Sequence, residues 1–484
     1  MSDARSAEPG RPPRRIAYVS FSTGQFDSRT ERMARSVIAA GDSVVAYARW
    51  EPGLSLVEER EGYRLVRVPV DTFMAIPGMG ASGRRRLERR LARALAAATG
   101  GAAPTTQTAS PAADPRAVGP LAAVPATGGL TGRVRRAVSG TPLFRPLRAV
   151  RDLARLPRRW LLFPASLRAF AVALDDVAEP ADLWHGMSIG ALPAVVRQKR
   201  RMRSVAVYDS RDIYMHAREL ARVGGLRRRL FEGAERRWAH ACDAVLTVND
   251  EYATILERQL GVPRPTVVMN CPERWSPGDP PPDLIRERLK LPASTSIVLY
   301  QGGLLSERGI EQSMDAILEL PDAVLVLLGY GRLRDSLATI VGREPYAGRV
   351  FLLEAVPPSE LLSWTASADV MVMAIQPSSL NHQHTTPNKL FEAMAAGVPV
   401  VASDLPGMAT IVRATGCGVL CDPTSPAAIA AAIRSVLGAP APERAAMRSR
   451  ALAAAYDRYN WESQVGNLLR LYDRLLPLGP ARSS

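Results

Sequence analysis

The sequence predicts an α/β protein with two lobes, each built on a parallel sheet. Short apolar runs such as Ile16–Ser20 and Ser296–Tyr300 alternate with amphipathic stretches that have helical spacing. The chain has 484 residues, which is enough for two full-sized cores. Prolines recur between Pro272 and Pro282 and predict a stiff linker between the lobes. Alternating strands and helices are most economically arranged as parallel sheets.

The first lobe opens with a strand, a loop and a helix. Residues 21–28 follow the first apolar run as a loop, and an amphipathic helix with Met33 and Val37 on its inner face comes next. Ser43–Ala48 then supplies a second strand. Asp27 is suited to cap the helix, because its side chain can accept a hydrogen bond from the first helical turn.

Polar residues follow two later strands of the first lobe. His185 lies near the end of a strand that begins after Asp182, and Asp209 and Arg211 follow the apolar run that begins at Ser204. Ligands gather beyond the carboxyl ends of parallel strands, so these residues are candidates for a cleft between the lobes. A lone histidine is more often structural, and that interpretation stays open for His185.

Two segments of the first lobe differ in composition. Residues 94–130 are rich in Ala, Pro, Thr and Gly and predict a disordered insertion. Residues 131–163 form a basic amphipathic segment that ends in Trp160–Phe163. A cationic stripe beside apolar residues suits a helix on an anionic membrane surface. A solvated charged face is the alternative. Nucleic acid is an unlikely partner, because no recognised binding module accompanies the charge.

Composition narrows the class of protein further. The net charge is +15, the apolar content is 47%, and the chain contains four cysteines. Four cysteines are too few for a disulfide framework, and their spacing does not favour a zinc site. Residues 1–14 do not resemble a signal peptide, and no apolar run of about 18 residues occurs. We therefore predict a cytoplasmic protein, either free or peripheral on the inner face of the plasma membrane.

The most informative stretch is residues 386–403. Pro387 suits the first turn of a helix, Lys389 and Glu392 share one face of it, and Gly397 ends it before an apolar strand. A cation, a carboxylate and free backbone N–H groups near one helix N-terminus suit a phosphate with a ribose beside it. An ordinary helix–strand unit with a solvated Lys–Glu pair would have the same spacing.

This stretch resembles the donor-site helix of the family-4 (group 1) retaining glycosyltransferases, in a sub-branch with the run Pro387-Asn-Lys-Leu-Phe-Glu392. The similarity extends through most of residues 15–475. It implies the GT-B fold: two Rossmann-like domains with parallel sheets that face a cleft, and a C-terminal helix that crosses back to the N-terminal domain. Two positions depart from the family pattern. The first family Glu is His384 here, and an arginine that holds the diphosphate is Gly303 here.

The resemblance also implies roles for individual residues. Glu392 would bind the ribose, Arg308 and Lys389 would hold the diphosphate, and His384 would replace the family acid at the sugar hydroxyls. The predicted catalytic residues are His185, Arg308, Lys389 and His384. The predicted donor-binding residues are Glu392, Asn388, Gly302, Gly303, Gly329, Gly331 and Glu354. The predicted cleft and acceptor-side residues are Gly24, Asp27, Arg29, Asp209 and Arg211.

The predicted domain organisation places a disordered N-terminus before two Rossmann-like domains. The ranges are 1–14 for that N-terminus, 15–271 for the acceptor-side domain, 272–284 for the linker, 285–457 for the nucleotide-sugar-binding domain, 458–478 for the crossing helix and 479–484 for the tail.

These features predict a retaining glycosyltransferase that uses neither a cofactor nor a metal. It would move a sugar from a nucleotide-diphosphate sugar to a lipid-linked or cell-envelope glycan acceptor, with no protein nucleophile. The alternative is a catalytically impaired GT-B protein that binds nucleotide sugars or regulates another protein, as Gly303 and His384 permit. A different reaction on the same fold, such as epimerisation or phosphorolysis, is a further rival.

Overall fold

The computed structural model describes residues 13–25, 27–70, 164–217, 220–221 and 223–477. The predicted segments 94–130 and 131–163 lie outside these residues, as do the tail 479–484 and most of the N-terminus. The chain divides into two compact units, residues 1–68 with 177–484, and residues 69–176. Besides residues 69–70, the described part of the smaller unit is a helical stretch over residues 164–173 and a 3-10 turn at Leu174–Asp176.

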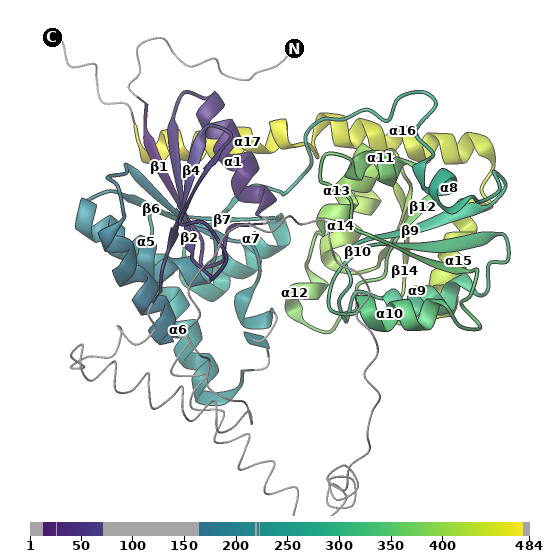
Figure 1. The fold of residues 1–484 in the computed structure, drawn as a ribbon, viewed down its shortest axis with the longest axis horizontal. Coiled ribbons are helices and arrows are strands. Elements are labelled where there is room, and N and C mark those ends of the chain that lie inside the picture. The colour runs from purple at the N-terminus through teal and green to yellow at the C-terminus, as the bar shows by residue number, and fades with distance from the viewer. Residues whose placement is uncertain (1–12, 26, 71–163, 218–219, 222, 478–484) are drawn as a thin grey trace, which may run out of the picture. The chain divides into compact units, whose positions relative to one another are not determined.

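The first lobe of the larger unit contains an eight-stranded sheet in the order β3-β4-β2-β1-β5-β6-β7-β8 (Figure 1). All neighbouring strands run parallel except β3 and β4, so the predicted parallel sheet is confirmed apart from one edge. A tight turn at Gly62, which has a positive φ of 80°, reverses the chain there. The strands are β1 (Arg15–Val19), β2 (Ser43–Arg49), β3 (Val57–Arg60), β4 (Tyr63–Val68), β5 (Leu183–Gly186), β6 (Val205–Ser210), β7 (Ala244–Thr247) and β8 (Thr266–Val267).

Two helices of this lobe, α1 and α7, begin at polar caps. Asp27 caps α1 as predicted, because its carboxylate accepts a hydrogen bond from the backbone N–H of Thr30 at 3.2 Å. Asn249 caps α7 in the same way. The helical elements are α1 (Ser28–Ala39), η3 (Ile189–Ala191), α5 (Leu192–Met202), η4 (Tyr214–His216), α6 (Gly225–Ala241), α7 (Asp250–Leu256) and the π-helical η6 (Glu257–Gly261).

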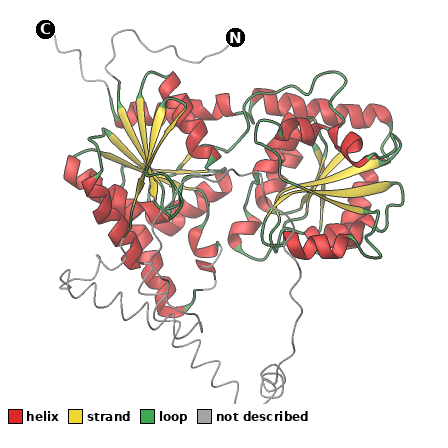
Figure 2. Cartoon of the chain, in the orientation of Figure 1, coloured by secondary structure: helices red, strands yellow, loops and turns green. Residues whose placement is uncertain are grey.

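The second lobe contains a six-stranded, fully parallel sheet in the order β11-β10-β9-β12-β13-β14. Its strands are almost continuously apolar because helices cover both faces (Figure 2). The strands are β9 (Ser296–Gly303), β10 (Ala323–Tyr330), β11 (Val350–Leu353), β12 (Val370–Met373), β13 (Val400–Ser403) and β14 (Gly418–Cys421). The helices are α8 (Leu284–Leu289), α9 (Ile310–Ile317), α10 (Arg334–Val341), α11 (Leu361–Ala366), α12 (Leu380–Gln383), α13 (Asn388–Ala395), α14 (Pro406–Thr415), α15 (Pro426–Leu437) and α16 (Ala441–Asp457).

The last helix, α17 (Trp461–Leu475), belongs to the core of the first lobe. Leu468 and Tyr472 are fully buried there, in one cluster with Ile16 and Tyr18 of β1. A C-terminal helix that packs on the N-terminal domain is the arrangement predicted from the sequence. None of the described helices combines the length and the apolar character needed to cross a bilayer.

Candidate functional site

The predicted donor helix is α13, and its apolar face fixes its orientation. Leu390, Phe391 and Met394 are buried against the second sheet, so Lys389 and Glu392 remain on a partly exposed face. The helix starts at Asn388, one residue later than expected. Pro387 has an extended backbone with ψ of 143° and serves as the N-cap.

Lys389 lies half-buried in an electropositive position. Its Nζ is 3.7 Å from the centroid of the Tyr300 ring, which is close enough for a cation–π contact. Burial, and then the positive charge of Arg308, lower the pKa of Lys389 to about 7, although Glu392 opposes this shift. Within the described chain, no carboxylate lies within salt-bridge distance of Lys389. Lys389 therefore has no salt-bridge partner among the described residues, although the Glu392 carboxylate acts on it at longer range.

Arg308 supplies the second positive charge at this place. It immediately precedes Gly309, whose φ of 72° leads into α9, and a Cβ on that glycine would lie only 1.9 Å from the Ala374 carbonyl oxygen. Among the described residues, the Arg308 side chain makes neither a hydrogen bond nor an ion pair. The structure thus brings together the two cations that the sequence predicts as a diphosphate clamp.

Glu392 is held by a short chain of side-chain hydrogen bonds. Gln301 Nε2 donates to Glu392 Oε2 at 2.5 Å, and Thr365 Oγ1 donates to Gln301 Oε1 at 2.7 Å. Burial raises the pKa of Glu392, against the effect of Gln301. Sequence reasoning missed Gln301 and Thr365. The available signal was a polar residue, Gln301, at the end of the apolar strand β9.

Glycines let two strand ends approach each other beside Lys389. A Cβ on Gly329 would lie 2.0 Å from the Gly302 carbonyl oxygen, and one on Gly331 would lie 2.3 Å from the Leu304 carbonyl oxygen. Gly329 has a φ of 157° and Gly331 a φ of 151°. Larger residues would disrupt this close approach. Gly303 differs, because its Cβ would meet only Leu305 at ordinary contact distance.

The remaining predicted donor residues lie at the rim. Asn388 is exposed at the start of α13. Glu354 is exposed and forms an ion pair with Arg334, whose Nη1 also donates to the carbonyl oxygens of Gly329 at 3.2 Å and Leu353 at 3.1 Å. Arg334 therefore joins the carboxyl ends of β10 and β11. The contact of Glu354 with a base stays a prediction.

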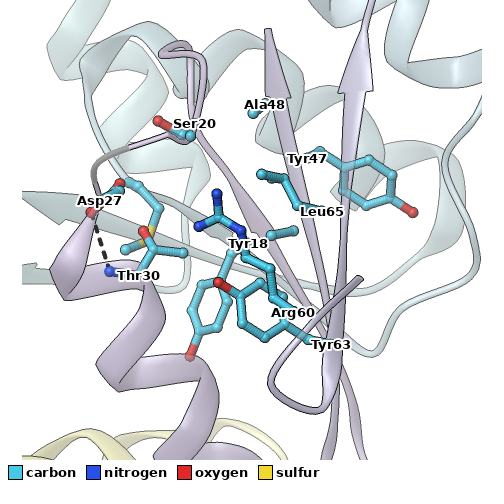
Figure 3. A pocket seen from close by; sticks show the side chains of 12 residues that line it. Tyr18, Ser20, Asp27, Thr30, Tyr47, Ala48, Arg60, Tyr63 and Leu65 are labelled. Carbon is cyan, nitrogen blue, oxygen red and sulfur yellow. Dashed lines mark hydrogen bonds between the residues drawn. The ribbon is translucent and has the colours of Figure 1, made fainter. Parts of the chain in front are cut away.

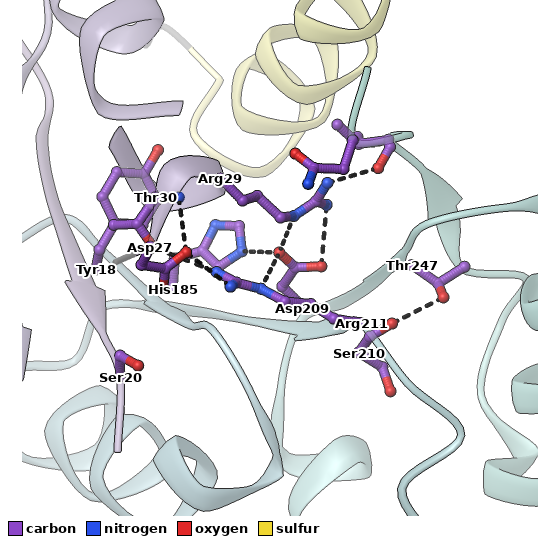
Figure 4. A network of polar contacts seen from close by, with 12 residues as sticks. Tyr18, Ser20, Asp27, Arg29, Thr30, His185, Asp209, Ser210, Arg211 and Thr247 are labelled. Carbon is purple, nitrogen blue, oxygen red and sulfur yellow. Dashed lines mark hydrogen bonds and ion pairs between the residues drawn. The ribbon is translucent and has the colours of Figure 1, made fainter. Parts of the chain in front are cut away.

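The predicted acceptor-side residues Arg29 and Asp209 form a buried ion pair in the first lobe (Figure 4). Arg29 Nε and Nη2 donate to the two carboxylate oxygens of Asp209 at 2.8 and 3.1 Å, and Nη1 donates to the Val268 carbonyl oxygen at 2.8 Å. Burial favours a higher pKa for Asp209, but Arg29 and then Arg211 lower it overall. This pair joins α1 to β6 and to the residue that follows β8.

Arg211 and Asp27 form a second ion pair beside the first. Arg211 Nη1 donates to Asp27 Oδ1 at 2.8 Å, and Nη2 donates to Thr30 Oγ1 at 3.2 Å. Asp27 also borders a small pocket with about 300 Å³ of empty space, part of it open to solvent (Figure 3). Gly24, with a φ of 71°, forms another part of its wall, and Arg60 and Tyr63 reach toward it. Two predicted acceptor-side residues thus border one cavity.

His185 is fully buried at the end of β5. Its Nδ1 is 2.6 Å from the Tyr472 hydroxyl, and Tyr472 in turn donates to the Tyr18 hydroxyl at 3.2 Å. Burial lowers the pKa of His185 to about 3, so the ring is neutral at physiological pH. Its predicted contact with sugar or acceptor stays a prediction. The structure shows a different contact, in which His185 joins β5 to α17.

His384 lies in a segment that contacts residues after β7. Its carbonyl oxygen accepts a hydrogen bond from Asn249 Nδ2 at 2.9 Å, and its Nδ1 lies 3.3 Å from Glu251 Oε2. Nearby, Asn381 Oδ1 accepts hydrogen bonds from the Ile213 backbone N–H at 2.7 Å and from the Tyr252 hydroxyl at 2.8 Å. Sequence reasoning missed these partners, since they lie more than a hundred positions away. The predicted role of His384 at the sugar hydroxyls stays a prediction.

Metal ligands do not gather at this place in the described ranges. No group of three or more His, Cys, Asp or Glu side chains there could hold a metal ion. The prediction of a metal-independent reaction rests instead on Arg308 and Lys389.

The chain is similar in sequence to several known proteins. Residues 283–453 match the family of group 1 glycosyl transferases. The chain is 30% identical over 203 residues to a D-inositol 3-phosphate glycosyltransferase of Xylanimonas cellulosilytica, an alignment that covers 41% of this chain and 47% of that protein. It is 25% identical over 338 residues to a 2-deoxystreptamine glucosyltransferase of Streptomyces kanamyceticus, which covers 68% and 81% of the two chains. The chain thus spans about half the length of the first of these relatives.

A solved structure shares the fold of the larger part of the chain. The Anabaena protein HepE, in complex with UDP and glucose, superposes on this chain with a TM-score of 0.59 at 15% sequence identity. The superposition covers 96% of this chain and 100% of the HepE chain. The fold is that of the GT-B glycosyltransferases, and residues 283–453 are similar to glycosyl transferase group 1.

Proposed function

We propose that this protein transfers a sugar from a nucleotide-diphosphate donor to an acceptor hydroxyl, with retention of the anomeric configuration and without a metal. One observation carries the proposal. Lys389, near the N-terminus of α13 and three residues before Glu392, feels the positive charge of Arg308, and neither cation has a salt-bridged carboxylate among the described residues. A diphosphate would neutralise both cations, and Glu392 would then accept hydrogen bonds from the ribose hydroxyls.

The same arrangement suits the chemistry of sugar transfer. Negative charge develops on the departing diphosphate, so fixed positive groups that face it stabilise the transition state more than the ground state. Arg308, Lys389 and the N–H groups at the start of α13 can provide this stabilisation. The leaving phosphate can then take the proton of the acceptor hydroxyl, and the reaction needs no protein nucleophile. HepE, with a similar fold, was solved with UDP and glucose, which supports a nucleotide sugar as the donor.

The acceptor that we propose is a lipid-linked or cell-envelope glycan. The support is the composition of residues 131–163, in which many arginines precede Trp160–Phe163. Such a segment would hold the enzyme at the inner face of the plasma membrane as a peripheral protein. The names of the two relatives mention D-inositol 3-phosphate and 2-deoxystreptamine, so acceptors vary among proteins that resemble this one.

The experiment combines binding and turnover. A calorimetric panel of nucleotide diphosphates and nucleotide sugars identifies the donor, and release of the nucleotide diphosphate in the presence of EDTA then reports transfer. Lys389→Met and Arg308→Met should each lower turnover at least tenfold, whereas Arg343→Met, at an exposed position, serves as the control and should leave it unchanged. Full activity of both Met variants would refute the clamp, and loss of turnover with EDTA would refute metal independence.

A second function, a nucleotide-sugar-binding protein without turnover, is favoured by the departures at Gly303 and His384. It predicts tight donor binding with no release of nucleotide diphosphate in the presence of membrane extracts or candidate acceptors. The enzyme hypothesis predicts binding together with release.

A further inference from the structure

The helix α6 carries an outward face that the fold does not explain. Leu226 is 72% exposed and Leu230 is 63% exposed, which makes them the most exposed aliphatic side chains in the described ranges. They are four positions apart, so they lie one turn apart on the same side of the helix. Exposed large apolar groups that are aligned in this way mark a surface that contacts something apolar.

Basic residues surround these two leucines. The positions 226, 230, 233 and 237 follow one line along the helix, so Arg237 extends the stripe and the small residue Gly233 interrupts it. Arg229 lies beside this line, and both arginines are exposed. Arg227, Arg236 and His240 are further exposed residues of the same helix.

The acidic residues of α6 do not neutralise this face. Glu235 is buried on the opposite side, where its Oε1 accepts a hydrogen bond from the Tyr208 hydroxyl at 2.7 Å. Glu232 forms an ion pair with Arg228 at 2.8 Å, toward the flank of the helix. The inner side of α6 packs on the first lobe through Ala239 and its neighbours, so the outward face is not needed to hold the helix in place.

We propose that this outward face of α6, which we call the α6 face, docks on an anionic lipid bilayer. The arginines complement the negative headgroups, and the two leucines reach into the boundary between headgroups and acyl chains. Nucleic acid or an acidic protein would account for the arginines alone, but neither needs two aligned leucines. The proposal needs no turnover, so its failure would leave the donor chemistry of the proposed function untouched.

The α6 face is separate in sequence from the basic segment at residues 131–163. It is an amphipathic surface on the lobe that carries the predicted acceptor-side residues. Docking there would hold that lobe at the membrane, where a lipid-linked acceptor would be found.

The test is co-sedimentation of the full chain with phosphatidylglycerol and with phosphatidylcholine vesicles. The variant Arg229→Gln/Arg237→Gln should bind phosphatidylglycerol about 30-fold more weakly at low salt, and high salt should remove this difference. The variant Leu226→Ser/Leu230→Ser should lose about tenfold at every salt concentration. All four side chains are exposed, so we expect both variants to fold, and unchanged thermal unfolding verifies this.

Matched controls on other elements are Arg343→Gln and Leu56→Ser, also at exposed positions, which should bind like the wild type. No binding of the wild type, or equal binding of both α6 variants and controls, overturns the proposal. A second outcome also overturns it: the leucine variant binds vesicles normally, and the arginine variant loses affinity for vesicles and for a DNA duplex to the same extent. If wild type self-associates and the leucine variant is monomeric with normal vesicle binding, the α6 face contacts a second copy and the lipid assignment is wrong.

Discussion

Lys389 makes donor affinity depend on pH in a range where most side chains do not titrate. In the free protein its pKa is about 7, first because of burial and second because of Arg308. A bound diphosphate supplies an anion and raises this pKa toward its usual value of 10.5. Binding is therefore strongest when Lys389 is already protonated, and it weakens as the pH rises through 7.

The size of the effect follows from the protonated fraction of the free protein. That fraction falls about fiftyfold between pH 7 and pH 9 for a pKa of about 7, so the dissociation constant of the donor should rise by about the same factor. At pH 8, binding should take up about 0.9 proton. His382 does not contribute in this range, because burial lowers its pKa. A terminal phosphate with a pKa near 6 is already ionised above pH 7, so the ligand contributes little.

Isothermal titration in buffers of different ionisation enthalpy measures both quantities with the nucleotide diphosphate that binds best. Lys389→Met should bind weakly with no pH dependence over this range. Lys389→Arg should keep the charge and also lose the pH dependence, because arginine stays protonated. An affinity of the wild type that is constant from pH 7 to pH 9, or a slope that survives in Lys389→Arg, would refute the reasoning.

Three further changes test other residues. Gly303→Arg should tighten nucleotide diphosphate binding about tenfold, because the site has room for a Cβ and gains a charge-assisted hydrogen bond. Weaker binding would mean that position 303 does not face the phosphates. Glu392→Gln should weaken nucleoside diphosphate binding about tenfold and leave inorganic pyrophosphate unaffected, whereas an equal loss for both ligands would contradict a ribose contact. Burial raises the pKa of Glu235 to about 7, so the free energy of unfolding of the wild type should fall as the pH rises from about 4.5 to 7. Glu235→Gln should remove this fall. Chemical unfolding at pH 8 should therefore show the variant about 3 kcal/mol more stable than the wild type. Parallel pH profiles of wild type and Glu235→Gln would show that this carboxyl does not ionise on unfolding.

The positions of most elements and of the donor helix follow from local patterns in the sequence. Apolar periodicity predicts the two parallel sheets, and a cap such as Asp27 predicts where a helix begins. The motif around Lys389 and Glu392 is also local, because three positions along a helix place both side chains on one face. The antiparallel edge strand β3 escaped prediction, because Val57–Arg60 has no strict alternation of apolar and polar residues.

Pairings across long sequence distances were decided by the tertiary structure alone. His185 and Tyr472 are 287 positions apart, and Gln301 and Glu392 are 91 apart, yet each pair forms a hydrogen bond. The same holds for the charge state of Lys389. The sequence by itself determined that a lysine stands at the helix N-terminus. Only the folded chain decided that it is half-buried beside Arg308 without a salt-bridge partner among the described residues, because burial and charge proximity depend on segments that come together in space.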